Sequence, residues 1–467
     1  MPVNLVLAVR TFVAVMICNI ALVFASQVNA ETINSALAAA YNNNPELNAQ
    51  RAATRAVDES VAIAKSGYRP TINGNANIGL SRTKSNSSLS SSLTGGNVTN
   101  LAPGQFGVVI SQTLWDSLLT YNSVEAARAA VGASQEALRN SEQNLLFNGA
   151  SAYLDVLRDR SILAFRRKSL EFLNEQVRSE QARFDVGEAT RTDVAQARAS
   201  RAAAQAQVSL ALANVRSSEA IYEQIIGHKP SNLRPVKGVS ALLPKSVQSG
   251  LAIAETEHPA IKSTEYLVDQ ASYNVRSAES SLLPSVNLQG SATRSFDQSS
   301  TSSVSENLSV TATLTVPIYQ GGRQAATIRQ NKETLGQRQI EVDQSVNSVR
   351  ANVVSSYSQH EGARASLVAN QEQLRAAQLA LEGAVEERKV GQRTTLDVLD
   401  TQTQVINAQI ALSNSTRDLK VAGYAILSAI GRLDASRLGL QVSVYDPQEH
   451  LQEVEDKWFG LRITTEN

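Results

Sequence analysis

The chain has 467 residues, with one cysteine, two methionines and 5% aromatic residues, and its 43 basic side chains balance 43 acidic ones. Zero net charge disfavours a nucleic-acid-binding protein, which normally presents a basic surface. So few aromatic rings also make several separate globular cores an unusual arrangement for this length.

The first thirty residues have the pattern of a secretory signal peptide. An apolar run at residues 11–25 follows Arg10, and small residues suit cleavage after Ala30. Residues 1–30 hold both methionines and the only cysteine, Cys18. We therefore expect an exported chain without thiols, which excludes disulfides, cysteine nucleophiles and thiolate metal sites. No later apolar run reaches the roughly 18 residues typical of a transmembrane helix.

The rest of the chain is an internal duplication. Pro45 and Pro70 recur as Pro259 and Pro284 at an offset of 214 residues. Later matches, at an offset of 204 residues, are Tyr153 with Tyr357, Gly187 with Gly391, Asp193 with Asp397 and Gly227 with Gly431. The offset changes across the Ser-rich stretches 81–100 and 295–306, which we expect to form an exposed tip because insertions collect in loops. The predicted first repeat is 31–230 and the second 251–431, with a linker at 231–250 and a tail at 432–467.

Each repeat contains two segments in which apolar and polar residues alternate, within 70–115 and 284–318. This pattern predicts one β-hairpin per repeat, with four strands of about ten residues each. The polar face consists of Ser, Thr, Asn and Gln, which is typical of strands that face a water-filled lumen. Four strands cannot close a barrel, and even eight leave an interior filled by side chains. A wet lumen therefore requires several chains, and three would supply twelve strands.

The remaining segments predict helices. Each repeat begins with a helix before its hairpin, and later helices are expected at 117–186, 193–226, 321–389 and 396–430. In the first long helix, Val124, Val131, Leu138 and Leu145 recur every seven residues, which predicts knobs-into-holes packing. The fold class is thus mixed α/β and internally duplicated. The helices alone would also suit a periplasmic helical-hairpin adaptor or a structural coiled-coil protein without a pore, but the two matched hairpins favour a channel.

Two motifs carry a family resemblance. VPIYQGG at 316–322 lies where the last strand leads into the second long helix, and VGQRTTLDVLD at 390–400 has a weaker copy, RFDVGEATRTDV, at 183–194. With the duplication, these motifs make the chain resemble the TolC family of outer-membrane efflux proteins. The resemblance implies a homotrimer with a twelve-stranded barrel in the bacterial outer membrane, in contact with its lipid, and a periplasmic tunnel of twelve helices. Residues 231–250 and 432–467 would form an equatorial belt around this tunnel.

The resemblance also implies a function. The trimer would be the passive exit duct of a tripartite efflux pump or a type I secretion system, with a gated periplasmic aperture. Its partners would be a periplasmic adaptor and an inner-membrane RND or ABC pump, and the cargo stays open between drugs and a secreted protein.

The segment 390–400 is the candidate aperture. Gly391 permits a turn between two helices, and Thr394 or Thr395 can cap the second helix. Asp397 and Asp400 are three residues apart and share one helix face. By resemblance this face points into the aperture, so three copies would gather six carboxylates that raise one another's pKa and favour cations.

Further site residues follow from the resemblance. The gate-closing links would be Arg393, Thr192 and Asp193, and Arg388 stands where the best-known pattern has a tyrosine, so we expect it to pair with Asp193. The adaptor-docking tips would be Val186, Gly187, Val390 and Gly391, and the membrane-interface aromatics Trp115 and Tyr319.

No catalytic constellation or phosphate-binding loop is recognisable. The four histidines, His228, His258, His360 and His450, lack ligand spacing and carboxylate partners in the sequence. We therefore expect no enzymatic activity, no metal site and no cofactor.

Overall fold

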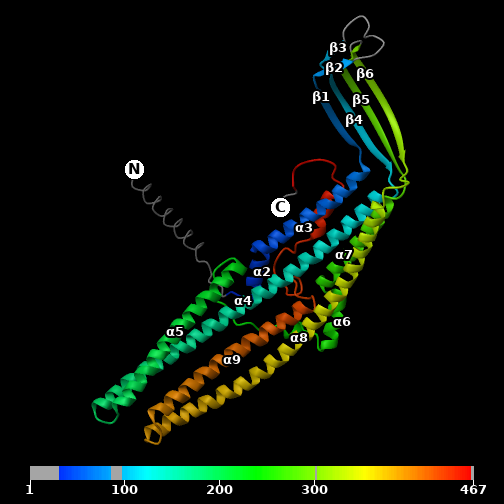
Figure 1. Ribbon diagram of the computed structural model, residues 1–467. Helices are drawn as coiled ribbons and strands as arrows, with labels where there is room; N and C mark the ends of the chain where they lie inside the picture. Colours follow the sequence, from blue (N-terminus) through cyan, green and yellow to red (C-terminus); the bar gives the residue numbers. More distant parts are fainter. Residues whose placement is uncertain (1–30, 86–96, 300–301, 464–467) are drawn as a thin grey trace, which may run out of the picture. The chain divides into compact units, whose positions relative to one another are not determined.

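The computed structural model describes residues 31–85, 97–299 and 302–463 (Figure 1). The predicted signal peptide, residues 1–30, lies outside the described residues. The chain divides into two compact units: unit 1 contains 31–45, 142–254 and 352–444, and unit 2 contains 46–141, 255–351 and 445–463. Within the described ranges, no helix has an apolar stretch long enough to cross a membrane.

Two helices of equal length, 67 residues, contribute to both units: α4 (Leu119–Asp185) and α8 (Arg323–Lys389). At 1.5 Å per residue each is about 100 Å long. They correspond to the helices expected at 117–186 and 321–389. The four residues of the predicted seven-residue seam are all buried, with exposures of 5% (Val124), 2% (Val131), 5% (Leu138) and 8% (Leu145), which confirms the packing face of α4.

Unit 1 joins the second halves of α4 and α8 to shorter helices: α2 (Ile33–Asn43), α5 (Arg191–Ile226), η2 (Ser240–Leu242), most of α6 (Val247–Glu257) and α9 (Thr395–Ala429). Tyr153 is fully buried, and its hydroxyl lies 2.8 Å from the carbonyl oxygens of both Glu31 and Arg234. Its ring packs 6.4 Å from that of Tyr222. A methyl group on Gly149 would come within 2.9 Å of Leu37, so α2 and α4 pack closely here. Tyrosines and aliphatic residues therefore form the core of this unit.

Unit 2 contains a sheet that extends from the ends of its helices (Figure 1). The helices are α3 (Pro45–Lys65), η1 (Ser66–Tyr68), α7 (Pro259–Ser280) and α10 (Pro447–Val454), with the first halves of α4 and α8. The antiparallel strands are β1 (Thr71–Ile78), β4 (Gly104–Trp115), β5 (Ser285–Ser299) and β6 (Ser302–Thr315), in the order β1-β4-β5-β6. A separate ribbon pairs β2 (Ser81–Ser85) with β3 (Asn97–Leu101).

The two predicted hairpins thus form one sheet, joined by the β4–β5 pairing. The expected strand length of about ten residues is too short for the second repeat, where β5 has 15 residues and β6 has 14. Most of the Ser-rich stretch 295–306 is strand rather than loop, because the backbone ladder continues past the apolar alternation and serine is compatible with it. In the first repeat the expected tip is partly β2 and β3, and residues 86–96 lie outside the described part.

Helix boundaries follow local chemistry in both repeats. The segment before each hairpin is a pair of helices, because Pro45 begins α3 and Pro259 begins α7. The linker 231–250 contains η2 and the start of α6, and the tail 432–467 contains α10. At the junction from sheet to long helix, Gly321 and Gly322 adopt positive φ angles of 64° and 79°. The matching residues of the first repeat, Ser117 and Leu118, adopt 56° and 69° without the freedom of glycine.

The expectation that the histidines lack carboxylate partners is wrong for two of them. His450 Nδ1 lies 2.9 Å from Asp58 Oδ2 in unit 2, and His228 Nε2 lies 3.4 Å from Glu31 Oε1 in unit 1. These partners are 392 and 197 residues apart in the chain, so only the fold brings them together. Across the residues that the structure describes, no group of three or more His, Cys, Asp and Glu side chains is placed to hold a metal ion.

Candidate functional site

Unit 1 ends in two helix-to-helix turns that lie at the same end of the unit (Figure 1). One connects α4 to α5 and contains Val186 and Gly187, and the other connects α8 to α9 and contains Val390 and Gly391. The two turns are built alike: each glycine has a positive φ, 81° and 78°, and its N–H donates to the carbonyl three residues earlier at 3.0 Å. This is a Schellman-type helix end, which requires a left-handed residue. The duplication predicted from sequence therefore extends to the geometry of the turns.

The helix that follows each turn begins with a capping box. Thr394 N donates to Asp397 Oδ2 at 2.9 Å, and Asp397 N donates back to Thr394 Oγ1 at 3.3 Å. Thr190 and Asp193 form the same reciprocal pair at 2.9 and 3.2 Å. Thr394, one of the two predicted caps, is thus the N-cap, whereas Thr395 is the first residue of α9. Asp397 and Asp193 both carry a structural role besides any role at the aperture.

Hydrogen bonding sets the acidity of these carboxylates within the chain. Donation from the Thr394 backbone and hydroxyl lowers the pKa of Asp397 below its ordinary value, and donation from Thr190 lowers that of Asp193. Asp397 is therefore ionised at neutral pH in the single chain. Asp400 lies exposed one turn further along α9. The predicted mutual rise in pKa among six carboxylates concerns the assembled trimer, and it stays a prediction.

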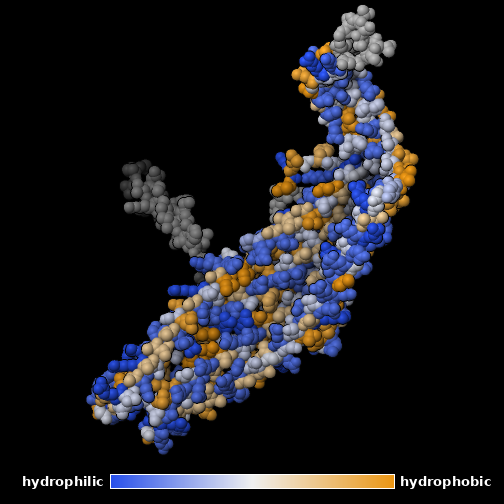
Figure 2. Space-filling model, in the orientation of Figure 1, coloured by the Kyte–Doolittle hydropathy of each residue, from blue (hydrophilic) through white to orange (hydrophobic). Residues whose placement is uncertain are grey.

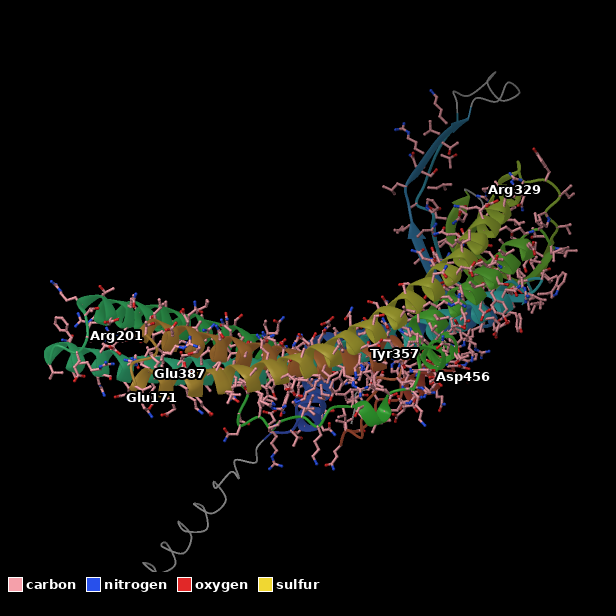
Figure 3. All side chains as sticks on the ribbon, turned by 90° about the horizontal axis from the view of Figure 1, so that it is seen from below. Glu171, Arg201, Arg329, Tyr357, Glu387 and Asp456 are labelled. Carbon is pink, nitrogen blue, oxygen red and sulfur yellow. The ribbon has the colours of Figure 1, made fainter. Side chains whose placement is uncertain are left out.

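The predicted gate-closing residues do not contact one another within the chain. Arg393 Nε lies 2.7 Å from Glu387 Oε2, near the end of α8 (Glu387 is labelled in Figure 3), and this ion pair raises the pKa of Arg393. Thr192 is exposed. The expected pair of Arg388 with Asp193 is absent, because Asp193 is held by Thr190 and Arg388 has a nearer partner.

That partner is Glu180 on α4, which forms an ion pair with Arg388 of α8. The Glu180 side chain is only 1% exposed and that of Arg388 14%. Gln176 Nε2 donates to the same carboxylate oxygen at 2.6 Å. Burial lowers the pKa of Arg388, but a guanidinium stays charged in proteins. A buried charge pair therefore connects the two long helices near their ends, since Glu180 lies five residues before the last residue of α4 and Arg388 one residue before the last residue of α8.

Glu180 was missed from the sequence although a signal was available. It continues the seven-residue register of Val124, and the register also places Asp159 at the seam. Both are buried, at 1% and 7% residue exposure. A charged residue in a packing register indicates a buried partner, but the sequence does not say that Arg388, 208 residues away, supplies it.

The remaining predicted sites are exposed. Val186 and Val390 are 73% and 72% exposed, so both turns present an aliphatic side chain to their surroundings. In unit 2, Trp115 ends β4 with 51% exposure and Tyr319 follows β6 with 84% exposure. One face of the sheet is also apolar and exposed, including Phe106, Leu308 and Val310 at 51%, 83% and 73%.

Comparison with known proteins agrees with this architecture. The family model described as outer membrane efflux protein matches residues 36–228 and 251–432, which are the two repeats. The chain is 47% identical over 433 residues to outer membrane efflux protein BepC of Brucella suis, spanning 92% of each chain. It is 26% identical to outer membrane protein TolC of Escherichia coli, spanning 89% of this chain and 85% of TolC.

A solved structure shows the same fold. The CmeC outer membrane channel of Campylobacter jejuni superimposes with a TM-score of 0.74 at 18% identity, covering 91% of this chain and 89% of CmeC. The resemblance inferred from the motifs is therefore confirmed, and the relatives are channels rather than pore-free adaptors or enzymes. Alkaline protease secretion protein AprF of Pseudomonas aeruginosa is a further relative, 26% identical over 70% of this chain and 68% of AprF. The chain belongs to the outer membrane efflux protein family, whose members are outer-membrane exit ducts of efflux and secretion systems.

Proposed function

We propose that three copies of this chain assemble around one axis into an exit duct that crosses the outer membrane and continues as a periplasmic tunnel. The observation that carries this proposal is the open sheet. In the four-stranded sheet, as far as the structure describes it, β1 and β6 are the edges, and each pairs on one side only. An unpaired edge is costly in lipid, where no water satisfies its backbone groups. Twelve strands from three copies would pair every edge around a lumen wide enough for water.

The burial of the two long helices supports the same assembly. Along α4, Val131 and Leu146 are 2% and 0% exposed. Along α8, the apolar residues Ile340, Val368 and Leu379 are 69%, 57% and 71% exposed. Because α8 repeats the position of α4 in the duplication, its exposed apolar residues suit contact with helices of a neighbouring copy.

Cysteine crosslinking tests the trimer directly. Asn75→Cys on β1 is combined in turn with Asn307→Cys, Ser309→Cys, Thr311→Cys or Thr313→Cys on β6. Within one chain these edges are three strand spacings apart, about 14 Å, too far for a disulfide. We expect at least one pair to give covalent dimers and trimers. As a control, Ser111→Cys on the inner strand β4 replaces Asn75→Cys, and it should give none. Only monomers from every pair would contradict the assembly.

We further propose that the two turns of unit 1 line the periplasmic aperture, with Asp397 and Asp400 facing it and with Arg393, Thr192 and Asp193 linking neighbouring copies when it is closed. In the assembled trimer, Arg393 would exchange Glu387 for a group on the next copy. Arg393→Ser with Asp193→Asn should raise single-channel conductance. Asn is chosen because its side-chain oxygen can still accept the hydrogen bond that Thr190 donates to Asp193. Arg178→Ser, which removes an exposed α4 arginine, is the control. Unchanged conductance of the closed state would remove these residues from the gate.

The same turns are proposed to dock a periplasmic adaptor that connects the duct to an inner-membrane RND or ABC pump. Val186→Asp with Val390→Asp keeps both glycines, so the turns should fold while losing their aliphatic contact. We expect less adaptor crosslinked to Gln392→Cys, an exposed position in the same turn, and an unchanged trimer. Leu242→Asp, at an exposed leucine of η2, is the control. Equal crosslinking in both variants would mean that the adaptor docks elsewhere. The identity of the inner-membrane pump recovered with the adaptor would distinguish drug efflux from protein secretion.

A further inference from the structure

We propose that the segment 457–463, which follows α10, is a membrane-interface anchor that inserts its apolar side chains into the phospholipids of the periplasmic leaflet. The inference depends on the outer-membrane location of the chain, and it is independent of the proposed gate and docking tips. Its sequence is KWFGLRI.

The four apolar side chains of this segment are strongly exposed. The values are 65% for Trp458, 89% for Phe459, 104% for Leu461 and 82% for Ile463. Figure 2 shows hydrophobic side chains at the surface of the segment. Four large exposed apolar side chains within seven positions are a concentration that soluble surfaces normally avoid. The patch therefore needs an apolar environment that the chain does not supply.

Specific contacts fix the position of the segment in unit 2. Arg69 Nη1 donates to the carbonyl oxygen of Lys457 at 2.8 Å, and its guanidinium lies 4.8 Å from the centre of the Trp458 ring. Just before the segment, Lys65 Nζ lies 2.6 Å from Glu455 Oε1 and 2.8 Å from Asp456 Oδ1 (Asp456 is labelled in Figure 3). The exposed side chains thus extend from a backbone that is held against the end of α3.

These contacts place the segment at the end of the sheet where the strands meet the helices. Arg69 is two residues before Thr71, the first residue of β1, which pairs with Ser111 of β4. Gln112 Nε2 donates to the Tyr68 carbonyl oxygen at 3.0 Å. Trp115, the predicted interface aromatic, lies at this same end of β4. The anchor is therefore at the level where the sheet leaves the membrane.

The composition of the segment selects lipid over a second copy of this chain. Trp at a membrane–water interface is favoured because its ring is apolar with one polar N–H. Lys457 precedes the apolar residues and Arg462 lies between Leu461 and Ile463, and no acidic residue lies within the segment. Two cations beside an apolar patch match phosphate head groups over acyl chains. The same segment of a second copy carries the same two cations, so it offers no such complement.

The two tryptophans of the chain allow a direct test. Trp115→Phe leaves Trp458 as the only reporter, and Trp458→Phe leaves Trp115 as the matched interface control. Adding Phe184→Trp to the double Phe variant supplies a water-exposed control near the end of α4. Each full-length variant is reconstituted into phosphatidylethanolamine and phosphatidylglycerol vesicles that contain lipids brominated near the head group or near the chain end. Tryptophan emission is then measured, with iodide as the aqueous quencher.

We expect head-group-proximal bromine to quench Trp458 about as strongly as Trp115, with little quenching in the Phe184→Trp control. Replacing Phe459 and Leu461 by serine should reduce the quenching of Trp458 and leave that of Trp115 unchanged. Quenching of Trp458 by iodide but not by bromolipid would show a segment in water and overturn the proposal. Shielding from both quenchers would indicate contact with protein, including a neighbouring copy, and would also overturn it. Quenching of Trp115 reports insertion of the sheet independently.

Discussion

The buried pair between Glu180 and Arg388 gives the sharpest energetic prediction. Arg388→Ala leaves the Glu180 carboxylate, 1% exposed, without its counter-charge. Removing one partner of a buried ion pair costs about 3–5 kcal/mol. Gln176 still donates to Glu180 Oε1 at 2.6 Å, which favours the lower end, about 3 kcal/mol. Separation of α4 from α8 near the turns should therefore become roughly a hundredfold more frequent.

Hydrogen exchange of peptides covering the ends of α4 and α8 measures this opening. The control is Arg375→Ala on the same helix, where the arginine is 76% exposed and pairs with Glu372 three residues away. Exposed pairs of this kind contribute under about 1 kcal/mol, so protection should hardly change. A second variant, Glu180→Leu with Arg388→Met, removes both charges and should recover most of the protection, because no uncompensated charge remains.

Two results would refute the reasoning. If Arg388→Ala and Arg375→Ala show equal exchange, the Glu180–Arg388 pair does not hold the helices together. If the double apolar variant exchanges as fast as Arg388→Ala, lost packing rather than an unpaired charge causes the opening.

Three further predictions follow from the repeats. His258 caps α7 through its neutral Nδ1, 3.1 Å from Ala260 N, and burial lowers the pKa of His258 to about 4. This depressed pKa contributes about 3 kcal/mol of stability that is present above pH 6.5 and lost as the pH falls toward 4. The matching position of the first repeat is Asn44, so His258→Asn should keep a capping side chain without the titration. We expect it to flatten the acid dependence of hydrogen exchange in α7. An unchanged acid dependence would exclude His258 as its source. Leu118 has a φ of 69° where the second repeat uses glycine, so Leu118→Gly should stabilise the assembly by about 1 kcal/mol. The measurement is the temperature at which the assembly dissociates, which should rise, and a lower temperature would contradict this reasoning. Asp397→Asn with Asp400→Asn should lower the cation selectivity of single channels while preserving the cap. Glu175→Gln, at an exposed acidic residue of α4, is the control, and equal selectivity in all three proteins would mean that the ring is not a filter.

Local patterns predicted the elements well. Proline positions and glycine turns mark the helix ends, and Thr-x-x-Asp at 190–193 and 394–397 forms a capping box in both repeats. The seven-residue register identified the buried face of α4. These features depend on residues within a few turns of one another, so the sequence expresses them directly.

Predictions that needed a partner far along the chain were weaker. Arg388 was expected to bind Asp193, but Asp193 is satisfied by its own capping box and Glu180 is available on the facing helix. The carboxylate partners of His450 and His228 lie on other elements, and the β4–β5 pairing that unites the hairpins connects the two repeats.

The sequence by itself determined the duplication, the alternation of sheet and long helices, the turns with their caps, and the family. The tertiary structure alone decided which charged groups are buried together and that Arg69 holds the exposed segment 457–463 at the end of the sheet. The reason is physical: periodicity and capping are properties of neighbouring residues, whereas the energy of a charge or an apolar side chain depends on what the folded chain places around it.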